Sequence, residues 1–193
     1  MASTNTLRRV GSTPEELRKV AETLAAAFKD DAVINALVGK ADQRLPSNVN
    51  INSFSTILKT GLYKLIWTVG WRGYKRVTGM GAKTDKVKAR AGVKSTQYWY
   101  CFFVGVRHEY QGKGLSSLLM SPHVAHKSGP LAPSHNNLPA WLESTSIKSR
   151  NVYEHLGFEL VETQIVAEGE VNEQGQTDPK GAGVKLYCMF KKA

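Results

Sequence analysis

A short glycine-rich stretch lies between an apolar run and a helical pattern, and it has the composition of an anion site. Residues 98–106 (YWYCFFVGV) are aromatic or β-branched and uncharged, which predicts a strand buried on both faces. The turn at residues 111–114 (QGKG) follows, and a helical pattern then begins at Leu115. Glycines allow a ligand to approach the backbone, and amide groups at a helix start favour anions. The spacing therefore predicts a phosphate or pyrophosphate site, to which Lys113 adds positive charge.

The details of this turn separate it from two common nucleotide motifs. A P-loop ends in Gly-Lys-Ser/Thr, and a dinucleotide fingerprint has a third glycine, neither of which occurs here. The run Gln111-Gly112-Lys113-Gly114-Leu115-Ser116 instead resembles the pyrophosphate loop of the GNAT acetyltransferases, [Q/R]-x-x-G-x-[G/A] in its usual form. An ordinary glycine-rich turn between a strand and a helix is the alternative interpretation.

A second motif follows at the distance that the same resemblance requires. Residues 141–145 (WLEST) predict a short strand, and residues 151–160 (NVYEHLGFEL) predict a helix that ends at Gly157 before another strand. In GNAT proteins the matching strand, helix and Y-E-x-x-G-F run complete the coenzyme A site. The resemblance covers about residues 98–166.

The resemblance implies acetyl-CoA as co-substrate and assigns roles to individual residues. It implies that the backbone of the strand pairs with the pantetheine arm, that the loop binds the pyrophosphate, and that Asn151 holds the arm. It implies that Tyr153 is the general acid, with half-buried packing as the alternative role. Glu143 is the best side-chain candidate for the base, while Glu109 or a chain of waters would be alternatives. The expected cofactor-binding residues are Val104, Gly105, Val106, Gln111, Gly112, Lys113, Gly114, Leu115, Ser116 and Asn151.

Composition and cysteine usage set wider limits. The 193 residues fit one GNAT-like domain over 1–193, and no apolar run reaches the ~18 residues of a membrane span. The N-terminus lacks a secretory layout, and Cys101 and Cys188 both fall in predicted strands, which favours free thiols in a reducing compartment. We therefore expect a cytoplasmic protein, with the nucleus as the alternative. The five histidines show no spacing typical of a metal site, so none is expected.

The remaining chain predicts the elements around these motifs. Thr13-Pro14 begins a helix to about Phe28, and a second helix covers residues 31–38; in the resemblance this pair lines the acceptor side. There Phe28, Asp30 and Asp31 would face substrate, or the two aspartates would only cap the second helix. Further helices are predicted at 54–69 and 115–126, with a break at 70–73 and a helical piece at 74–80. Loops are predicted at 40–53 and 128–139, and a short strand at 7–10. The last two predicted strands, at 158–168 and 184–190, are joined by a flexible loop at 169–183.

One part of the pattern departs from the GNAT resemblance. GNAT domains place an antiparallel strand hairpin between the first helices and the coenzyme A strand, but residues 40–97 show no convincing pair of alternating apolar runs. The expected fold class is thus α/β (α+β), with a GNAT-like mixed, mostly antiparallel sheet flanked by helices and part of the N-terminal hairpin in question.

Charge adds a further hypothesis about partners. The formal net charge is +10, and residues 72–94 hold eight Lys or Arg against one Asp. This segment would bind nucleic acid or an acidic protein, or would be a solvated, mobile connector.

The sequence leaves three hypotheses for the function: an N-acetyltransferase acting on a small-molecule or peptide amine, a coenzyme A-binding protein with an impaired acceptor side, and, less favoured, a basic nucleic-acid-binding module. The sequence sets neither the acceptor nor the oligomeric state.

Overall fold

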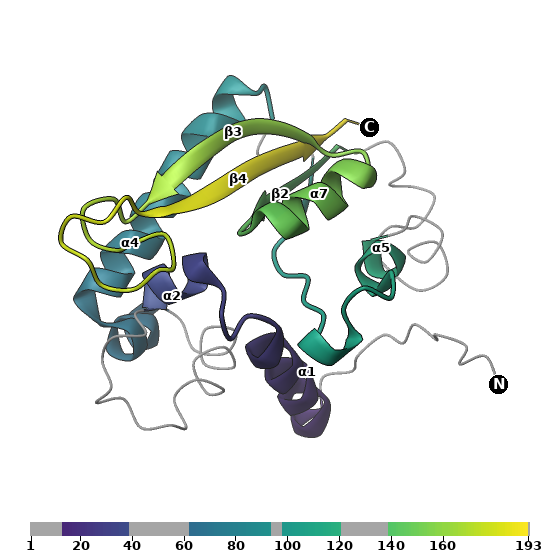
Figure 1. Ribbon diagram of the computed structural model, residues 1–193, viewed down its shortest axis with the longest axis horizontal. Helices are drawn as coiled ribbons and strands as arrows, with labels where there is room; N and C mark the ends of the chain where they lie inside the picture. The colour runs from purple at the N-terminus through teal and green to yellow at the C-terminus, as the bar shows by residue number, and fades with distance from the viewer. Residues whose placement is uncertain (1–12, 39–61, 94–97, 121–138, 193) are drawn as a thin grey trace.

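A four-stranded sheet forms the centre of the computed structural model, which describes residues 13–38, 62–93, 98–120 and 139–192 (Figure 1). The strands are β1 (Trp99–Cys101), β2 (Ala140–Ser144), β3 (Glu159–Val166) and β4 (Val184–Lys191), in the spatial order β1-β2-β4-β3. The β1–β2 pair is parallel and the other two pairs are antiparallel. The predicted mixed, mostly antiparallel sheet with flanking helices is confirmed.

The two faces of the sheet pack against different helices, because successive strand residues point to opposite sides. Trp141 and Cys188, both fully buried, lie on the face that α4 (Leu62–Arg90) covers. Leu142 and Met189, the next residue on each strand, lie on the other face with Tyr153 of α7 (Ile147–His155). The predicted strands at 158–168 and 184–190, and the helix that ends before Gly157, are thereby confirmed.

The helix α4 is continuous where the sequence predicted a break and then a basic connector. The predicted break at residues 70–73 is wrong, and so is the mobile connector considered for residues 72–94, of which residues 72–90 belong to α4. Tertiary contacts outweigh the ~1 kcal/mol that a glycine costs in a helix. Arg76 donates to the Ala36 carbonyl oxygen at 2.7 Å and pairs with Glu170, Lys83 donates to a β3 carbonyl oxygen at 3.4 Å, and Arg90 pairs with Glu162 of β3. Basic side chains therefore fasten this helix along the sheet.

The strand predicted over residues 98–106 is much shorter than expected. Only Trp99–Cys101 forms a ladder, and residues 102–107 continue without one, so burial on both faces was also wrong. Tyr100 is 42% exposed and Phe102 is 59% exposed. Phe103 makes edge contacts with Phe102 (4.5 Å between ring centroids) and with Phe28 (5.8 Å) at the end of α1. The aromatic residues beyond Cys101 thus pack on a helix and on one another, and their backbone does not extend the sheet.

The two N-terminal helices, α1 (Pro14–Ala27) and α2 (Ala32–Val38), begin as predicted. The Thr13 hydroxyl oxygen accepts the Glu16 amide hydrogen at 3.3 Å and caps α1. Asp31 Oδ1 accepts the Ile34 amide hydrogen at 2.9 Å, so Asp31 caps α2. The capping role considered for Asp31 is confirmed.

Several expectations concern residues outside the described part of the chain. These are the strand at 7–10, the loops at 40–53 and 128–138, residues 54–61 and 121–126 of two predicted helices, and most of the region in which the missing hairpin was sought. Within 62–93 the chain is helix and turn.

The helix predicted from residue 115 is present as α5 (Leu115–Met120), preceded by the 3₁₀ turn His108–Tyr110. In the described segments, no helix is long and apolar enough to cross a bilayer.

The loop between β3 and β4, predicted to be flexible, follows a defined course over α2. Asn172 Oδ1 accepts two amide hydrogens, from Gln174 and Gln176 at 3.0 Å each. Gly175 (φ +74°) lies against α2 so closely that a Cβ there would be 2.2 Å from the Ala32 carbonyl oxygen. The loop and α2 share an apolar cluster with Val171 and Val184.

We expect Gly175→Ala to lower the free energy of unfolding by at least about 2 kcal/mol more than Gly169→Ala. Both positions have positive φ and the same backbone strain, but a Cβ at Gly169 meets open space, whereas at Gly175 it would clash with α2. Urea unfolding followed by tryptophan fluorescence measures both variants. Equal destabilisation would show that the close packing of this loop on α2 is absent.

Candidate functional site

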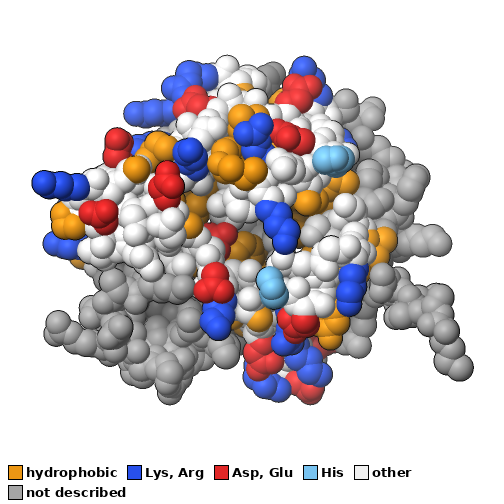
Figure 2. Space-filling view, viewed as in Figure 1, with side chains coloured by type: hydrophobic (Ala, Val, Ile, Leu, Met, Phe, Trp, Pro, Cys, Tyr) orange, Lys and Arg blue, Asp and Glu red, His pale blue; other side chains and the backbone are white. Residues whose placement is uncertain are grey.

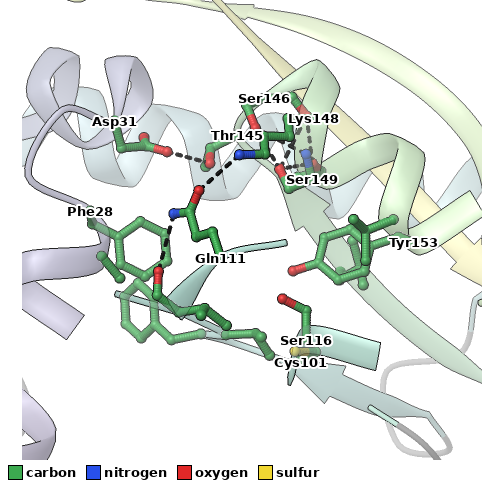
Figure 3. A pocket seen from close by; sticks show the side chains of 18 of the residues that line it. Phe28, Asp31, Cys101, Gln111, Ser116, Thr145, Ser146, Lys148, Ser149 and Tyr153 are labelled. Atoms are coloured by element: carbon green, nitrogen blue, oxygen red, sulfur yellow. Dashed lines mark hydrogen bonds between the residues drawn. The ribbon is translucent and has the colours of Figure 1, made fainter. Parts of the chain in front are cut away.

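A cavity of about 400 Å³ opens where β1 and β2 part. The strands stay paired up to Cys101 and Leu142 and then diverge. The extension of β1 and the loop before α5 form one wall, the end of β2 and the start of α7 form another, and the α1–α2 corner closes the cavity (Figures 1 and 3). Because parallel strands separate here, backbone groups of residues 102–106 face a cavity in place of a neighbouring strand.

Gly105 allows α1 to close this wall. A Cβ at Gly105 would be 2.8 Å from Ala27 Cβ, closer than real Cβ atoms come, and 3.2 Å from the Phe28 ring, a tight contact. Glycine therefore brings α1 directly onto the strand extension. Val104, Gly105 and Val106, predicted to pair with the pantetheine arm, all line the cavity.

The glycine loop has the conformation that its sequence predicted. Gly112 (φ +76°) and Gly114 (φ +71°) are left-handed, and a Cβ at either would meet nothing within 4 Å, so the loop presents open backbone. The Gly114 carbonyl oxygen accepts the Leu118 amide hydrogen at 3.0 Å, which starts α5. Gln111 donates from its side chain to the Val106 carbonyl oxygen at 3.2 Å and accepts from Lys148 Nζ at 2.8 Å, joining the loop to α7 (Figure 3).

Tyr153 lies on the cavity wall and in the core at once. It is 9% exposed, and its ring packs edge-on to Phe158 at 6.0 Å. Figure 3 shows its hydroxyl directed into the cavity, near the side chains of Ser116 and Cys101. Burial, and to a smaller extent the nearby Cys101 thiol, raises the pKa of Tyr153 to about 12. The hydroxyl is therefore protonated at neutral pH and can donate a hydrogen bond there.

Glu143 lines the cavity, but its carboxylate is held on the α4 side of the sheet. Oε1 accepts the Trp141 indole hydrogen and Oε2 accepts the Tyr100 hydroxyl hydrogen, both at 2.6 Å. Lys88 Nζ lies 3.9 Å from Oε1, with side chains only 12% and 11% exposed. Burial, followed by the charge of Glu143, raises the pKa of Tyr100. Glu143 and Trp141 therefore share the α4 face of the sheet, and each carboxylate oxygen already accepts a hydrogen bond from a side chain.

Some predicted site residues lie apart from the cavity. Asn151 is on the exposed side of α7, and its carbonyl oxygen is 2.6 Å from His155 Nδ1. The Lys113 ammonium stands over the Tyr110 ring at 5.2 Å, and Glu109, the alternative base, pairs with Arg107 at 2.8 Å. Gln111, Gly112, Gly114, Leu115 and Ser116 do line the cavity, whereas Lys113 and Asn151 do not.

Polar residues that sequence reasoning had not assigned to the site complete its walls. Thr145 donates its hydroxyl hydrogen to Asp31 Oδ2 across the cavity edge. Ser146 caps α7 by accepting the Ser149 amide hydrogen at 3.1 Å. Thr145 is the last residue of the predicted strand and Ser146 follows it, and no motif in the sequence marked either position. Across the described ranges, no cluster of three or more His, Cys, Asp or Glu side chains could hold a metal ion.

Comparison with known proteins supports the family resemblance. No protein-family profile matches the chain. Over 121 residues, 58% of this chain, it is 31% identical to an uncharacterized N-acetyltransferase of Schizosaccharomyces pombe. The match covers 44% of that relative, so the chain spans less than half of the relative's length.

Two solved structures show the likeness in fold. A "histone acetyltransferase HPA2 and related acetyltransferase" from Corynebacterium glutamicum matches over 94% of both chains, with a TM-score of 0.57 and 14% identity. Arylalkylamine N-acetyltransferase 2 from Aedes aegypti matches over 95% of this chain and 98% of its own, with a TM-score of 0.54 and 16% identity. The parted strands, the glycine loop and these likenesses agree: the chain has the fold of the GNAT acetyltransferases, the superfamily that its two sequence motifs resemble.

Proposed function

We propose that this chain is an acetyl-CoA-dependent N-acetyltransferase that moves an acetyl group from the thioester to a primary amine. The observation that carries this proposal is the cavity between the parted β1 and β2, which has the open glycine loop on one wall and the Tyr153 hydroxyl on another. The N-acetyltransferase name of the curated relative supports the same activity.

The lining residues fit acetyl-CoA chemically. The co-substrate supplies an activated acetyl thioester, a pantetheine arm that can pair like a strand, and a pyrophosphate. Residues 104–106 offer backbone groups without a strand partner, and the left-handed glycines at 112 and 114 leave space in front of the loop amides for an anion. In this proposal an amide hydrogen of Val104 or Val106 polarises the thioester carbonyl oxygen, a contribution of about 3 kcal/mol in comparable sites.

Tyr153 acts by donating a hydrogen bond to the leaving sulfur. A phenol with a pKa of about 12 is a weaker acid than a thiol of pKa ~8.5, so complete proton transfer on its own would cost roughly 5 kcal/mol. The proton released by the attacking amine can offset this cost if it reaches the phenol as the phenol's own proton moves to sulfur. Burial thus keeps Tyr153 in the donor state and couples its action to the amine.

The contacts of Glu143 do not favour it as the base that accepts the proton of the amine. Its two oxygens accept hydrogen bonds from Trp141 and Tyr100, and Lys88 lies beside it. These contacts direct the carboxylate to the α4 side of the sheet, away from an amine in the cavity. Its contacts favour a role in joining β2 to β1 and α4.

A small amine is the acceptor class that the cavity favours over a nucleic acid or protein partner. Aromatic side chains, among them Phe28, Phe102 and Phe103, line the acceptor side, and one structural neighbour is named an arylalkylamine N-acetyltransferase. The basic side chains of α4 that suggested nucleic acid are largely used inside the protein, as Arg76, Lys83 and Arg90 show. Figure 2 shows Lys and Arg interspersed with Asp and Glu on the face viewed.

The deciding experiment combines calorimetry with coenzyme A and thiol release with acetyl-CoA and an amine panel. Micromolar binding and turnover of at least one primary amine would support the enzyme. Binding without turnover on any amine would favour the coenzyme A-binding alternative, and absence of binding would reject both.

We predict that Gly114→Ala weakens coenzyme A binding at least about 10-fold, because its Cβ and altered backbone would enter the space in front of the loop. Gly92→Ala is the matched control: it has the same φ of +71° and open surroundings, but lies after α4. Calorimetry compares the two, and equal affinities would place the pyrophosphate elsewhere.

For Tyr153→Phe we expect kcat to fall about 100-fold while the dissociation constant of coenzyme A stays within twofold. The ring still fills its place in the core, and only the donor is lost. Tyr187→Phe removes a hydroxyl from the same core cluster but outside the cavity lining, and should keep wild-type kcat. Unchanged turnover of Tyr153→Phe would assign this residue to packing alone.

The raised pKa of Tyr153 also predicts a loss of stability at alkaline pH. Since the folded pKa of about 12 exceeds the unfolded value near 10, the contribution is complete below pH 10 and is lost as pH rises through 12. Over this window, wild type should lose up to about 2–3 kcal/mol more unfolding free energy than Tyr153→Phe. Urea unfolding at a series of pH values tests this, and a constant difference between the two proteins would contradict it.

A further inference from the structure

Two acidic side chains line the cavity, and they differ in what balances their charge. Glu143 has the Lys88 ammonium at 3.9 Å. Asp31, at the corner between α1 and α2, forms no ion pair with any side chain of the described segments. Lys148 of α7, which also lines the cavity, donates to Gln111 and not to Asp31. Asp31 is therefore a cavity carboxylate whose charge no described cation neutralises.

The contacts of Asp31 hold its carboxylate in one orientation. Oδ1 accepts the Ile34 amide hydrogen at 2.9 Å, and Oδ2 accepts the Thr145 hydroxyl hydrogen. These donors and the Val33 amide are all neutral, and the two carboxylate oxygens together offer about four acceptor sites. Figure 3 shows the Asp31 side chain extended toward Thr145 at the cavity edge. The group is thus oriented by the protein and retains acceptor capacity for a ligand.

The surroundings make this charge costly without a cation. Phe28, Ile34 and Phe103 also line the cavity. Burial raises the pKa of Asp31 and outweighs the hydrogen bonds from Thr145, Ile34 and Val33, which lower it. A ligand cation would supply the missing charge, and an apolar body beside it would replace water against the two aromatic rings.

We propose that Asp31 binds the ammonium group of the acceptor, and that Phe28 and Phe103 contact its apolar part. This inference rests on the proposed function and specifies its substrate class: a primary amine that enters as a cation with an apolar or aromatic body. Thr145 positions the carboxylate through its hydroxyl. A charge-assisted hydrogen bond of this kind changes affinity by about 10- to 100-fold.

Three variants separate charge recognition from a capping role. Asp31→Asn removes the charge but retains an oxygen that can accept from Ile34 and Thr145, and Asn is as good a helix cap as Asp. Thr145→Val removes the hydrogen bond to Asp31 and keeps the charge. Asp30→Asn removes the adjacent, exposed carboxylate, which does not line the cavity. Thermal unfolding of each variant checks that the fold is kept.

The test measures binding of two probes that need no turnover, N,N-dimethyl-2-phenylethylamine, which is cationic, and 2-phenylethanol, its neutral counterpart. Calorimetry is done with and without saturating coenzyme A. Wild type and Asp30→Asn should prefer the cation at least 10-fold, Asp31→Asn should lose that preference, and Thr145→Val should keep most of it.

Equal binding of the two probes by wild type, or a preference that survives in Asp31→Asn, would overturn the assignment of Asp31. Failure of the proposed function has a different signature, because coenzyme A binding and thiol release would be absent while a preference for the cationic probe could still be measured on the protein alone.

Discussion

The parting of two parallel strands is the constraint on which the rest of this structure depends. β1 and β2 exchange hydrogen bonds for three residue pairs, and beyond Cys101 and Leu142 the backbone of each must find other partners. Unpaired backbone groups are costly when buried, so such a separation persists only where a ligand or solvent reaches them. α1 fixes one side of the gap by its contact with Gly105, and α7 fixes the other through Tyr153 and Leu142.

Contacts on the opposite face of the sheet hold β1 and β2 together next to the point where they part. Trp141 and Cys188 are fully buried against α4, and the Lys88–Glu143 pair joins that helix to β2. Tyr100 reaches the same carboxylate from β1, so the two parting strands are held together on the side away from Tyr153. Four basic side chains of this segment, Arg76, Lys83, Lys88 and Arg90, thus hold a long helix to the sheet and to the elements beside it.

Burial has the same physical effect on two titratable groups at the cavity to which we assign roles in the proposed function. It raises the pKa of both Tyr153 and Asp31, because the charged form of each loses solvation. For a phenol, this keeps the proton that a departing sulfur needs. For a carboxylate, it makes the ionised form depend on a nearby cation, which the proposed amine would provide.

Local chemistry in the chain was sufficient to predict the glycine loop, the helix caps at Thr13 and Asp31, the C-terminal strand pair and the helix before Gly157, since each depends on residues within a few positions. It also placed Tyr153 at the site, through the motif around it. The length of β1, the continuity of α4 and the orientation of Glu143 depended on contacts between residues far apart in the chain: Phe103 with Phe28, Arg76 with Glu170, and Glu143 with Lys88. Asp31 illustrates both cases. Its capping of α2 could be predicted from the neighbouring residues, whereas its contact with Thr145 at the cavity depends on the packing of α2 against the end of β2.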